Sequence, residues 1–338
     1  AGWESIELEA SKHDETAFRQ SIFSKFRAAL LHISPRRRWS KRARHAAEVL
    51  SSFVLSIDQS GTFSVTWDVD PSEGYGDHGD LGLDLTDVFL AVGDVAKEKE
   101  TGIVLLIDEV QFLTTVQLES LIQAVHKSVQ KKLPITFVGA GLPQIAELAG
   151  DAKSYAERLF KFPRIDSLTP EEARQALVGP AETEKVSYDE DAVDLAVSLT
   201  HGYPYFIQEL GYQAWIVASG NHITAEDIST AKEAYEAKLD GSFFRVRLDR
   251  ATPLQTAYMR AMAELGSEPQ KAADVASLMK RESSQVAPIR SQLIDMGLLY
   301  TPQHGYAAFT VPDFDKFMMR AVPRLEVPEI QHRRRRGK

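Results

Sequence analysis

An uninterrupted aliphatic run at residues 103–107, IVLLI, constrains the fold of this chain more than any other sequence feature. It lies between Gly102 and Asp108, and such a run is typical of a parallel strand buried on both faces of a sheet. A second run, at residues 135–139, follows a helical pattern at residues 116–130. Strands that alternate with helices predict an open α/β sheet, in which ligands bind at the carboxyl ends of the strands.

The chain before this run predicts one more strand and helix, and then an inserted hairpin. Residues 4–9 alternate polar and apolar side chains, and residues 15–31 repeat apolar side chains at helical spacing. Residues 53–57 and 63–69 have a β-like composition and are separated by the turn-forming sequence DQSG. We therefore expect a β-hairpin between elements of the α/β core.

From Thr169 onward, helical patterns replace the strands. Thr169 and Glu172 form a capping box, with Pro170 at the first helical position. Further helices are predicted at residues 189–199, 204–219 and 225–239. A last unit begins near Thr252 and reads as three helices followed by two short β-like runs, around residues 298–300 and 306–310. This order is the pattern of a winged helix-turn-helix.

The composition is that of a modular protein. The 338 residues exceed the ~100 to 200 of an ordinary domain, so we expect two or three domains. No apolar run approaches the ~20 residues that span a bilayer. The chain has no cysteine, and its first residues lack the basic and apolar regions of a signal peptide. We expect a cytoplasmic protein with no membrane partner.

Two basic clusters stand out against a net charge of −9. A chain with this charge is not expected to coat nucleic acid by bulk attraction, but a local basic patch can still bind it. Six basic side chains surround Trp39 within residues 36–44, and four arginines occupy residues 333–336. Each cluster is either a solvated segment or a nucleic-acid contact, and the sequence leaves both interpretations open.

Asp108 and Glu109, which follow the first aliphatic run, form the strongest chemical signal. In phosphoryl-transfer sites one carboxylate holds Mg²⁺ and another orients the attacking water. Adjacent acids at a strand end also occur as solvated termini or helix caps. A metal-dependent nuclease is a further interpretation, but it needs another carboxylate at a neighbouring strand end, and the run at residues 135–139 offers none.

Four motifs, in this order, resemble the bacterial and archaeal AAA+/STAND ATPases that are related to origin-recognition proteins. They are GIVLLIDEVQFL at residues 102–113, LPITFVGAGLPQI at 133–145, LTPEEARQAL at 168–177 and HGYPYFIQELGYQAW at 201–215. The resemblance extends over roughly residues 1–320. It implies an α/β fold: a P-loop NTPase parallel sheet, incomplete at its N-terminal side, followed by an α-helical lid and a C-terminal winged-helix domain.

The resemblance also implies domain boundaries and a cofactor. The core without its Walker A loop would occupy residues 1–165, the lid 166–248 and the winged helix 249–322, with a basic, disordered tail at 323–338. ATP or ADP, together with Mg²⁺, would be the ligand of the full-length protein. Asp108 and Glu109 would be the Walker B pair, with Asp108 as the metal ligand.

Other residues receive roles from the same resemblance. Gly202, Tyr203 and Pro204 are similar to the GxP motif of STAND lids, in which the proline packs against adenine. Pro204 also suits the first position of a helix, and both roles can hold. Arg158 and Arg164 lie where such ATPases place an arginine finger that reaches the γ-phosphate of a neighbouring nucleotide. A structural ion pair is the alternative role for either arginine.

The sequence departs from the family pattern in three places. No segment matches GxxxxGK[ST], the loop whose backbone N–H groups and lysine hold the phosphates. Residues 139–141 offer no polar side chain at the position of sensor 1, and Tyr205 stands where many lids have an arginine. We expect that this chain is a truncated form with little or no hydrolysis, and that the missing strand leaves sheet edges unpaired. Pairing of those edges with another copy would give a homo-oligomer.

The winged-helix segment offers candidate nucleic-acid contacts in its turn and last helix: Lys280, Arg281, Ser284, Gln285 and Arg290. Between residues 251 and 320, however, seven basic side chains balance seven acidic ones, whereas autonomous DNA-binding modules usually carry a basic excess. The partner is therefore either double-stranded DNA or a protein. Two functions remain, a nucleotide-dependent switch and a non-enzymatic DNA-binding or regulatory adaptor derived from an ATPase.

Overall fold

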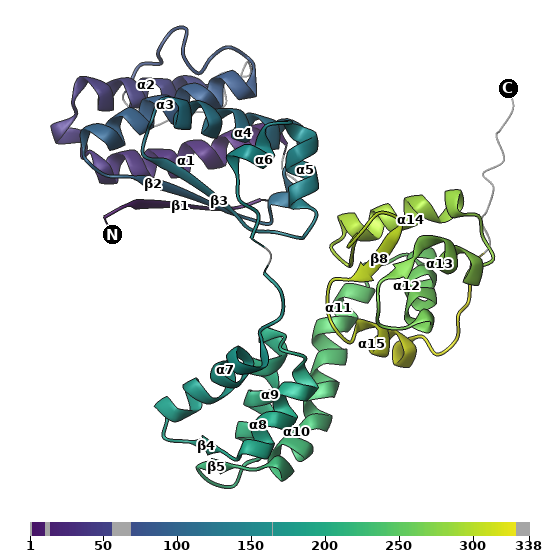
Figure 1. The fold of residues 1–338 in the computed structure, drawn as a ribbon. Coiled ribbons are helices and arrows are strands. Elements are labelled where there is room, and N and C mark those ends of the chain that lie inside the picture. The colour runs from purple at the N-terminus through teal and green to yellow at the C-terminus, as the bar shows by residue number, and fades with distance from the viewer. Residues whose placement is uncertain (1, 11–13, 56–68, 164, 329–338) are drawn as a thin grey trace, which may run out of the picture. The chain divides into compact units, whose positions relative to one another are not determined.

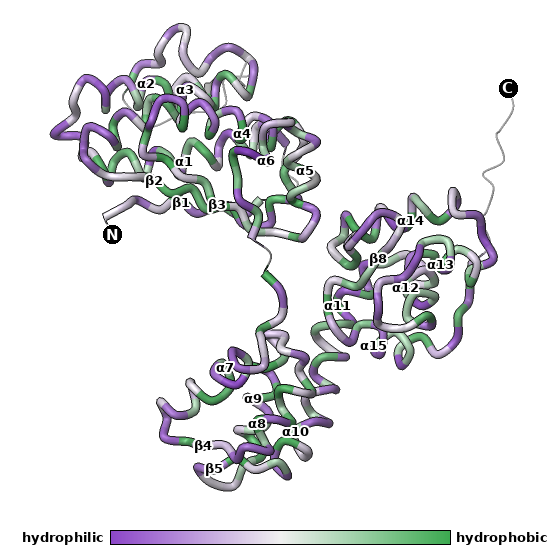
Figure 2. Tube along the Cα trace, viewed as in Figure 1, coloured by the Kyte–Doolittle hydropathy of each residue, from purple (hydrophilic) through white to green (hydrophobic). Residues whose placement is uncertain are grey.

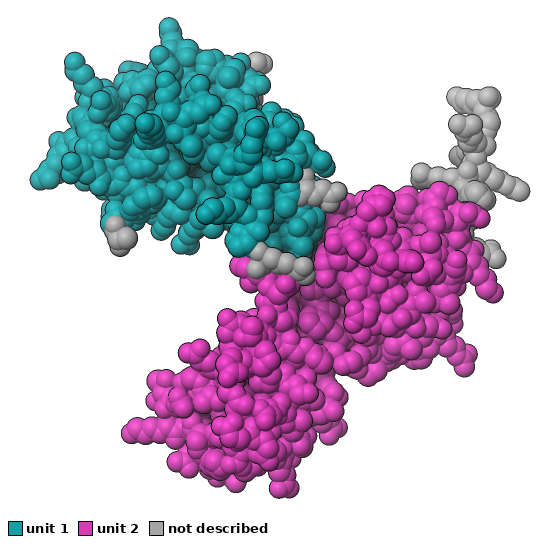
Figure 3. Space-filling model, viewed as in Figure 1, with its two compact units in different colours: residues 1–163 teal, residues 164–338 magenta. Residues whose placement is uncertain are grey.

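The computed structural model describes residues 2–10, 14–55, 69–163 and 165–328. The chain divides into two compact units, residues 1–163 and 164–338 (Figure 3). No helix within the described residues combines the length and the apolar content needed to cross a membrane. Hydrophobic and hydrophilic residues alternate along the helices of both units (Figure 2).

The N-terminal unit is built on a parallel three-stranded sheet with the order β1-β2-β3. Its strands are β1 (Glu4–Glu9), β2 (Ile103–Asp108) and β3 (Ile135–Gly139). Four long helices stack on one side of the sheet in Figure 1: α1 (Glu15–Ile33), α2 (Lys41–Leu55), α3 (Leu81–Glu98) and α4 (Thr115–Gln130). The predicted α/β class with a parallel sheet is confirmed.

The two faces of this sheet differ in burial. Ile103, Leu105 and Ile107 alternate along β2 on the face that the helices cover, and all three are buried. On the opposite face Val104 and Leu106 are only partly buried, and Val138 of β3 is exposed. The expectation that the aliphatic run is buried on both faces is therefore wrong for the described residues, because all four long helices lie on the same side.

Cap residues fix the helix starts in the N-terminal unit. Asp14 and Asp80 accept backbone N–H groups at the starts of α1 and α3, and Thr114 forms a capping box at the start of α4. Ring packing between Phe26 and Phe89, with centroids 5.2 Å apart, joins α1 to α3 inside the core. The helices thus pack apolar faces that begin at defined caps.

A buried ion pair also joins α1 to α3. The guanidinium of Arg19 lies 2.9 Å from the carboxylate of Asp84, with side chains that are 1% and 0% exposed. Asp84 also accepts the backbone N–H of His78 at 2.8 Å, and Arg19 donates to the more exposed Glu15 and to the carbonyl of Phe53. Both charges are therefore removed from water and satisfied by one another and by neighbouring polar groups.

The predicted hairpin is wrong at its first strand. The described part of that strand, residues 53–55, forms the last turn of α2. Ala46, Val49, Leu50 and Phe53 are buried at helical spacing, so burial along one helix face outweighs the β-like local composition. The remainder of the hairpin, apart from Val69, lies at residues 56–68, outside the described residues.

The C-terminal unit begins with four helices: α7 (Pro170–Thr183), α8 (Glu190–Thr200), α9 (Pro204–Val217) and α10 (Ala225–Lys238). A two-residue parallel pair, β4 (Ser187–Tyr188) with β5 (His222–Ile223), joins their loops and was not predicted. A π-helix, η3 (Leu239–Phe244), then connects α10 to the short α11 (Arg245–Leu248). Its final turn is closed by the backbone N–H of Arg245, which donates to the carbonyl of Asp240.

The rest of this unit is a winged helix, as predicted. Its helices are α12 (Pro253–Leu265), α13 (Ala272–Leu278) and α14 (Ser283–Asp295), and α15 (Phe314–Ala321) follows the wing. The small sheet has the order β6-β8-β7, from β6 (Gln270–Lys271), β7 (Leu299–Tyr300) and β8 (Tyr306–Phe309). All strand pairs in this sheet are antiparallel.

The segment after α15 differs from the prediction of a disordered tail from residue 323. Leu325 and Val327 pack against the core of the C-terminal unit. Arg260 donates to the carbonyl of Val322 at 2.7 Å, and Arg281 donates to the carbonyl of Pro328. Two arginines of the winged helix therefore hold the segment that ends at residue 328; the arginines at 333–336 lie outside the described residues.

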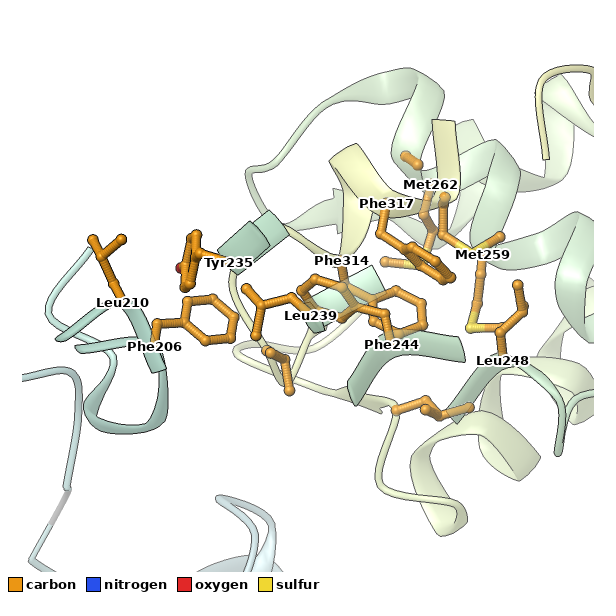
Figure 4. Packing of buried hydrophobic residues seen from close by; sticks show 14 of the residues in the cluster. Phe206, Leu210, Tyr235, Leu239, Phe244, Leu248, Met259, Met262, Phe314 and Phe317 are labelled. Carbon is orange, nitrogen blue, oxygen red and sulfur yellow. The ribbon is translucent and has the colours of Figure 1, made fainter. Parts of the chain in front are cut away.

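An aromatic cluster joins η3 to α15. Phe244 is fully buried and stacks on Phe317, with centroids 5.2 Å apart and planes inclined by 25°. It also meets Phe314 edge-on at 5.6 Å and Phe206 of α9 at 6.0 Å (Figure 4). At the surface beside this cluster Arg320 pairs with Asp240 through two hydrogen bonds. The helical segment and the winged helix thus share one core.

Candidate functional site

Asp108 ends β2 at the carboxyl edge of the sheet, where its side chain is exposed. One carboxylate oxygen accepts the backbone N–H of Glu109 at 2.8 Å. The other oxygen has no hydrogen-bond or ion-pair partner among the described residues. Glu109 adopts a left-handed conformation, with φ of 55°, which turns the chain sharply away from the strand. Asp108 therefore presents one unengaged oxygen at the strand end.

Gln111 ties this turn to the turn that follows β3. Its amide nitrogen donates to the Glu109 carboxylate, and its amide oxygen accepts the backbone N–H of Leu142 at 3.2 Å. Backbone hydrogen bonds run in parallel, because Val110 donates to the carbonyl of Ala140 at 3.0 Å. The carboxyl ends of the two strands are therefore fixed to one another, and Glu109 is held by the side chain of Gln111.

Gly141 explains why the turn after β3 offers no polar side chain. A Cβ atom at this position would lie 2.2 Å from the amide oxygen of Gln111 and 3.2 Å from the backbone nitrogen of Val110. A side chain at residue 141 would displace Gln111. The amide of Gln111 thus lies beside residues 139–141, which have no polar side chain of their own. The sequence pattern alone does not reveal this position of Gln111.

The described residues include only one of the two candidate arginines, Arg158. Arg158 is exposed in α6 (Ala156–Leu159), and within the described residues no acidic side chain lies within ion-pair distance of it. The structural ion pair that the sequence suggested for Arg158 is therefore not seen. Arg164 lies outside the described residues. In the basic cluster near Trp39, the first three arginines form an exposed 3₁₀ turn, η1 (Arg36–Arg38), and the other three basic residues lie in the first turn of α2.

The Gly202–Tyr203–Pro204 motif forms the turn between α8 and α9. His201 and Gly202 both have left-handed backbones, with φ of 49° and 69°. Gly202 is buried, and its carbonyl accepts the backbone N–H of Leu168 at 2.9 Å. Tyr203 is the N-cap residue of α9, and Pro204 is exposed at its first helical position. The structural role of Pro204 is thus present, and the adenine contact stays a prediction.

Replacement of Gly202 by alanine is expected to lower the free energy of unfolding of the C-terminal unit by about 2 kcal/mol or more. A Cβ atom there would lie 2.2 Å from the carbonyl oxygen of Leu168, and the left-handed backbone adds strain. Urea denaturation followed by circular dichroism measures the change. Gly220→Ala is the matched control, because its Cβ would meet no atom within 4 Å. Equal effects of the two substitutions would contradict this account of the turn.

Tyr205 belongs to an aromatic stack that the sequence analysis did not foresee. Its ring stacks on Phe243, with centroids 4.7 Å apart and planes inclined by 16°, and it remains partly exposed. The guanidinium of Arg247 lies 3.8 Å from the centroid of the same Phe243 ring and donates to the carbonyl of Phe243 at 2.8 Å. Arg247 has no acidic partner among the described residues.

Burial changes the ionisation of this group of residues. It lowers the pKa of Arg247, and it raises the pKa of the Tyr203 hydroxyl. A half-buried guanidinium without a carboxylate partner, beside partly exposed aromatic rings, suits a planar anionic ligand. In the sequence, the segment FFRVRLDR at residues 243–250, with two adjacent aromatic residues and spaced arginines, was the signal from which this group could have been predicted.

The five candidate nucleic-acid residues differ in their exposure and in their contacts within the protein. Lys280 and Ser284 are exposed at the turn before α14 and in its first turn. Gln285 is exposed, but its side-chain oxygen accepts the backbone N–H of Glu282 in a capping box. Arg281 is engaged with Pro328, and Arg290 is half-buried and lines a small cavity. Two of the five positions therefore face other parts of the protein.

The candidate residues fall into the two separate units. Asp108, Glu109 and Arg158 belong to the N-terminal unit, and the motif at residues 202–204 belongs to the C-terminal unit. Within each unit the local geometry is defined: the structure brings Glu109 to Gln111, and Tyr205 to Phe243 and Arg247. No group of three or more histidine, aspartate or glutamate side chains able to hold a metal occurs among the described residues.

Comparison with known sequences gives two similarities. A family described as a domain of unknown function, DUF8462, matches residues 241–318, which run from η3 into α15. An uncharacterized HTH-type transcriptional regulator of Methanocaldococcus jannaschii, MJ0774, is 23% identical over 209 residues. These residues are 60% of this chain and 51% of that protein. The chain thus spans about half the length of the curated relative that it matches.

Comparison with solved structures gives three further similarities. Cdc6p from Pyrobaculum aerophilum is 13% identical, with 96% of this chain and 82% of that chain covered and a TM-score of 0.42. Aeropyrum pernix Orc1, in a complex with DNA, is 13% identical, with 94% and 86% covered and a TM-score of 0.38. The Holliday junction branch migration motor RuvB of Thermotoga maritima is 16% identical, with 75% and 87% covered and a TM-score of 0.39.

Proposed function

We propose that this chain is part of a nucleotide-dependent switch of the AAA+/STAND type, in which nucleotide state controls what the winged helix binds. The arrangement of Asp108, Glu109 and Gln111 carries the proposal. An exposed carboxylate stands at the carboxyl end of the middle parallel strand, which is where open α/β sheets bind ligands. The neighbouring Glu109 is oriented by the Gln111 amide rather than left to solvent.

The residues fit a Mg²⁺–nucleotide in part. Mg²⁺ is usually held by one or two carboxylates together with water and phosphate oxygens, and Asp108 has an oxygen free for such a contact. The bound cation would neutralise charge on the phosphates. In the proposed switch Glu109 would position water, and Gly202, Tyr203 and Pro204 would contact the base. Arg158 would act as an arginine finger that reaches the γ-phosphate of a neighbouring nucleotide.

Binding, rather than rapid hydrolysis, is the activity that we assign to these 338 residues. Their sequence contains no GxxxxGK[ST] loop, so the backbone cradle and the lysine that stabilise the transition state of phosphoryl transfer are not among them. We propose the division of labour that the resemblance implies: a nucleotide-binding core at residues 1–165, a lid at 166–248 and a partner-binding winged helix at 249–322.

A DNA-binding or regulatory adaptor without nucleotide chemistry is the second candidate. The exposed Lys280 and Ser284 at the start of α14 support it, since that helix is the one that enters the major groove in helix-turn-helix proteins. The similarity to an HTH-type transcriptional regulator supports it as well. Double-stranded DNA would be the partner in this case.

The Asp108→Asn variant is expected to bind a fluorescent ADP at least about tenfold more weakly than the original chain when Mg²⁺ is present, because a charged contact to the cation is lost. Fluorescence anisotropy measures both affinities, and the difference should vanish when EDTA removes the metal. Asp94→Asn is the matched control, because it removes the charge of another exposed aspartate, which lies on α3 and not at the end of β2.

Two results separate the candidate functions. Absence of ADP binding by the chain would rule out the switch for these residues and leave the adaptor. Salt-dependent binding of duplex DNA that falls in the Lys280→Gln variant would then support the adaptor. Equal ADP binding by Asp108→Asn and the original chain would show that the nucleotide is bound without the proposed metal ligand.

A further inference from the structure

The basic cluster near Trp39 forms a concentrated positive surface at the turn between α1 and α2. Its six residues are all exposed: Arg36, Arg37, Arg38, Lys41, Arg42 and Arg44. No acidic residue occurs within residues 36–44. The other residues of the chain, which carries a net charge of −9, are acidic in sum. The N-terminal unit therefore presents a strong local positive charge on a chain that is negative elsewhere.

The backbone that carries the basic cluster is held in a defined shape. The backbone N–H of Arg38 donates to the carbonyl of Pro35 at 2.8 Å. The indole N–H of Trp39 donates to the carbonyl of Ser34 at 2.8 Å, and the Trp39 ring packs against the core of the N-terminal unit. The hydroxyl of Ser40 accepts a backbone N–H from the first turn of α2 at 3.2 Å. An anionic partner would therefore meet these cations without first ordering a loop.

Helix stability does not explain the cations at the start of α2. The first turn of a helix carries a partial positive charge, which favours acidic side chains there and disfavours basic ones. Both α1 and α3 follow this rule, with Glu15 and Asp84 in their first turns. The first turn of α2 has no acidic residue and holds three of the six basic residues of the cluster. These residues therefore act against the local preference of the helix.

Ion pairing within the protein leaves most of the cluster unneutralised. Arg42 lies 3.6 Å from the carboxylate of Glu98, at the end of α3. Among the described residues, no acidic side chain lies within ion-pair distance of four other members: Arg37, Arg38, Lys41 and Arg44. Exposed cations that have no partner within the protein remain available to an external anion.

We propose that the basic cluster binds the phosphate backbone of double-helical nucleic acid without reading its sequence. Five of its six cations are arginines, whose guanidinium groups donate two parallel hydrogen bonds to a phosphate. A duplex carries one charge per ~1.7 Å of its axis, so several neighbouring cations can each meet a phosphate. The acidic remainder of the chain would repel the duplex and confine the contact to this surface.

The apolar residues of the segment favour nucleic acid over a membrane surface. Binding in the plane of a bilayer needs exposed apolar side chains that enter the lipid. The apolar residues within positions 36–44 are Trp39 and Ala43, of which Ala43 is buried and Trp39 packs against the core. The contact would be made by the N-terminal unit, so it requires neither Asp108 nor the winged helix.

The test measures the fluorescence anisotropy of a labelled duplex of about 20 base pairs with the full chain, at salt concentrations between about 50 and 200 mM. The triple variant Arg37→Gln, Arg38→Gln, Lys41→Gln removes three exposed cations and no buried side chain. It should bind the duplex about tenfold more weakly or worse, and the slope of log affinity against log salt should shrink by about 2 to 3. A duplex of unrelated sequence should behave in the same way.

A second triple variant serves as the matched control. Lys127→Gln, Lys131→Gln and Lys132→Gln together remove three exposed lysines at the end of α4 and just after it. The net charge changes by the same amount, but the basic cluster remains intact, so duplex binding should stay nearly unchanged. Circular dichroism of both variants should match that of the original chain.

Each other outcome overturns the proposal. Absence of duplex binding by the original chain at the lowest salt would do so, and an equal loss in the two triple variants would assign binding to bulk charge. Loss of binding in Lys280→Gln, with none in the variant of the cluster, would place the duplex on the winged helix. Cluster-dependent binding of phosphatidylserine vesicles or of polyglutamate, without binding of the duplex, would assign the cluster to a membrane or to an acidic protein.

Discussion

Replacement of Asp84 by alanine is expected to lower the free energy of unfolding of the N-terminal unit by about 3–5 kcal/mol. The substitution leaves the guanidinium of Arg19, which is 1% exposed, without the carboxylate 2.9 Å away that balances its charge. It also removes the acceptor of the His78 backbone N–H. Chemical denaturation of the full chain, followed by intrinsic fluorescence and circular dichroism, measures the loss.

Two further variants test the physical reason for this effect. Glu15→Ala removes the other acid that pairs with Arg19, but that side chain is 51% exposed, so a change below about 1 kcal/mol is expected. The double variant Arg19→Met with Asp84→Leu removes both buried charges and should recover most of the stability, because the loss of the buried carboxylate beside Arg19 is the cause of the effect. A double variant as unstable as Asp84→Ala would show that packing, not charge, dominates at this position.

Replacement of Phe244 by alanine is expected to lower the free energy of unfolding of the C-terminal unit by about 3–5 kcal/mol. The ring is fully buried and packs against Phe314 and Phe317 of α15 and against Phe206 of α9 (Figure 4). Removal of the ring leaves a void at the point where the helical segment and the winged helix share their core. Thermal and urea denaturation both report the change.

The same variant should also reduce the cooperativity of unfolding. If Phe244 joins the two halves of the core, its loss separates their transitions, and probes of α7–α10 and of α12–α15 will report different midpoints. Val246→Ala is the control, because Val246 is two residues away and 48% exposed, so that its effect should stay within about 0.5 kcal/mol. A single transition that retains the original stability in Phe244→Ala would contradict a shared core.

Local patterns sufficed for much of the fold. The aliphatic run at 103–107 becomes β2 and the run at 135–139 becomes β3, and the capping box at Thr169 starts α7 as expected. These elements follow from short-range signals, namely apolar runs, helical spacing and caps. The strand predicted at residues 53–57 is wrong at residues 53–55. There, local β-like composition competes with burial of Phe53 beneath Arg19, a contact between residues 34 positions apart.

The candidate sites show the same division between local and distant information. Asp108 and Glu109 are adjacent in the sequence, so their position at a strand end could be predicted. The hydrogen bond from Leu142 to Gln111 and the stack of Tyr205 on Phe243 join residues that are 31 and 38 positions apart, and no periodicity reveals them. Likewise, the engagement of Arg281 with Pro328, 47 residues later, removes a surface cation that composition alone would assign to DNA.

The π-helix Leu239–Phe244 connects α10 to α11, and the number of residues in this connection is as important as their identity. Each residue of an α-helix turns the chain by about 100° and advances it by 1.5 Å. Deleting one residue from this segment would restore ordinary helical register between α10 and α11. It would also rotate α11 about the helix axis, so that the residue at the position of Phe244 would no longer point toward Phe317. Substitutions at the exposed Gly241 and Ser242 leave that angle unchanged. During divergence, the exposed positions 241 and 242 are therefore free to vary in side chain, whereas single-residue insertions and deletions in this segment would disturb the core.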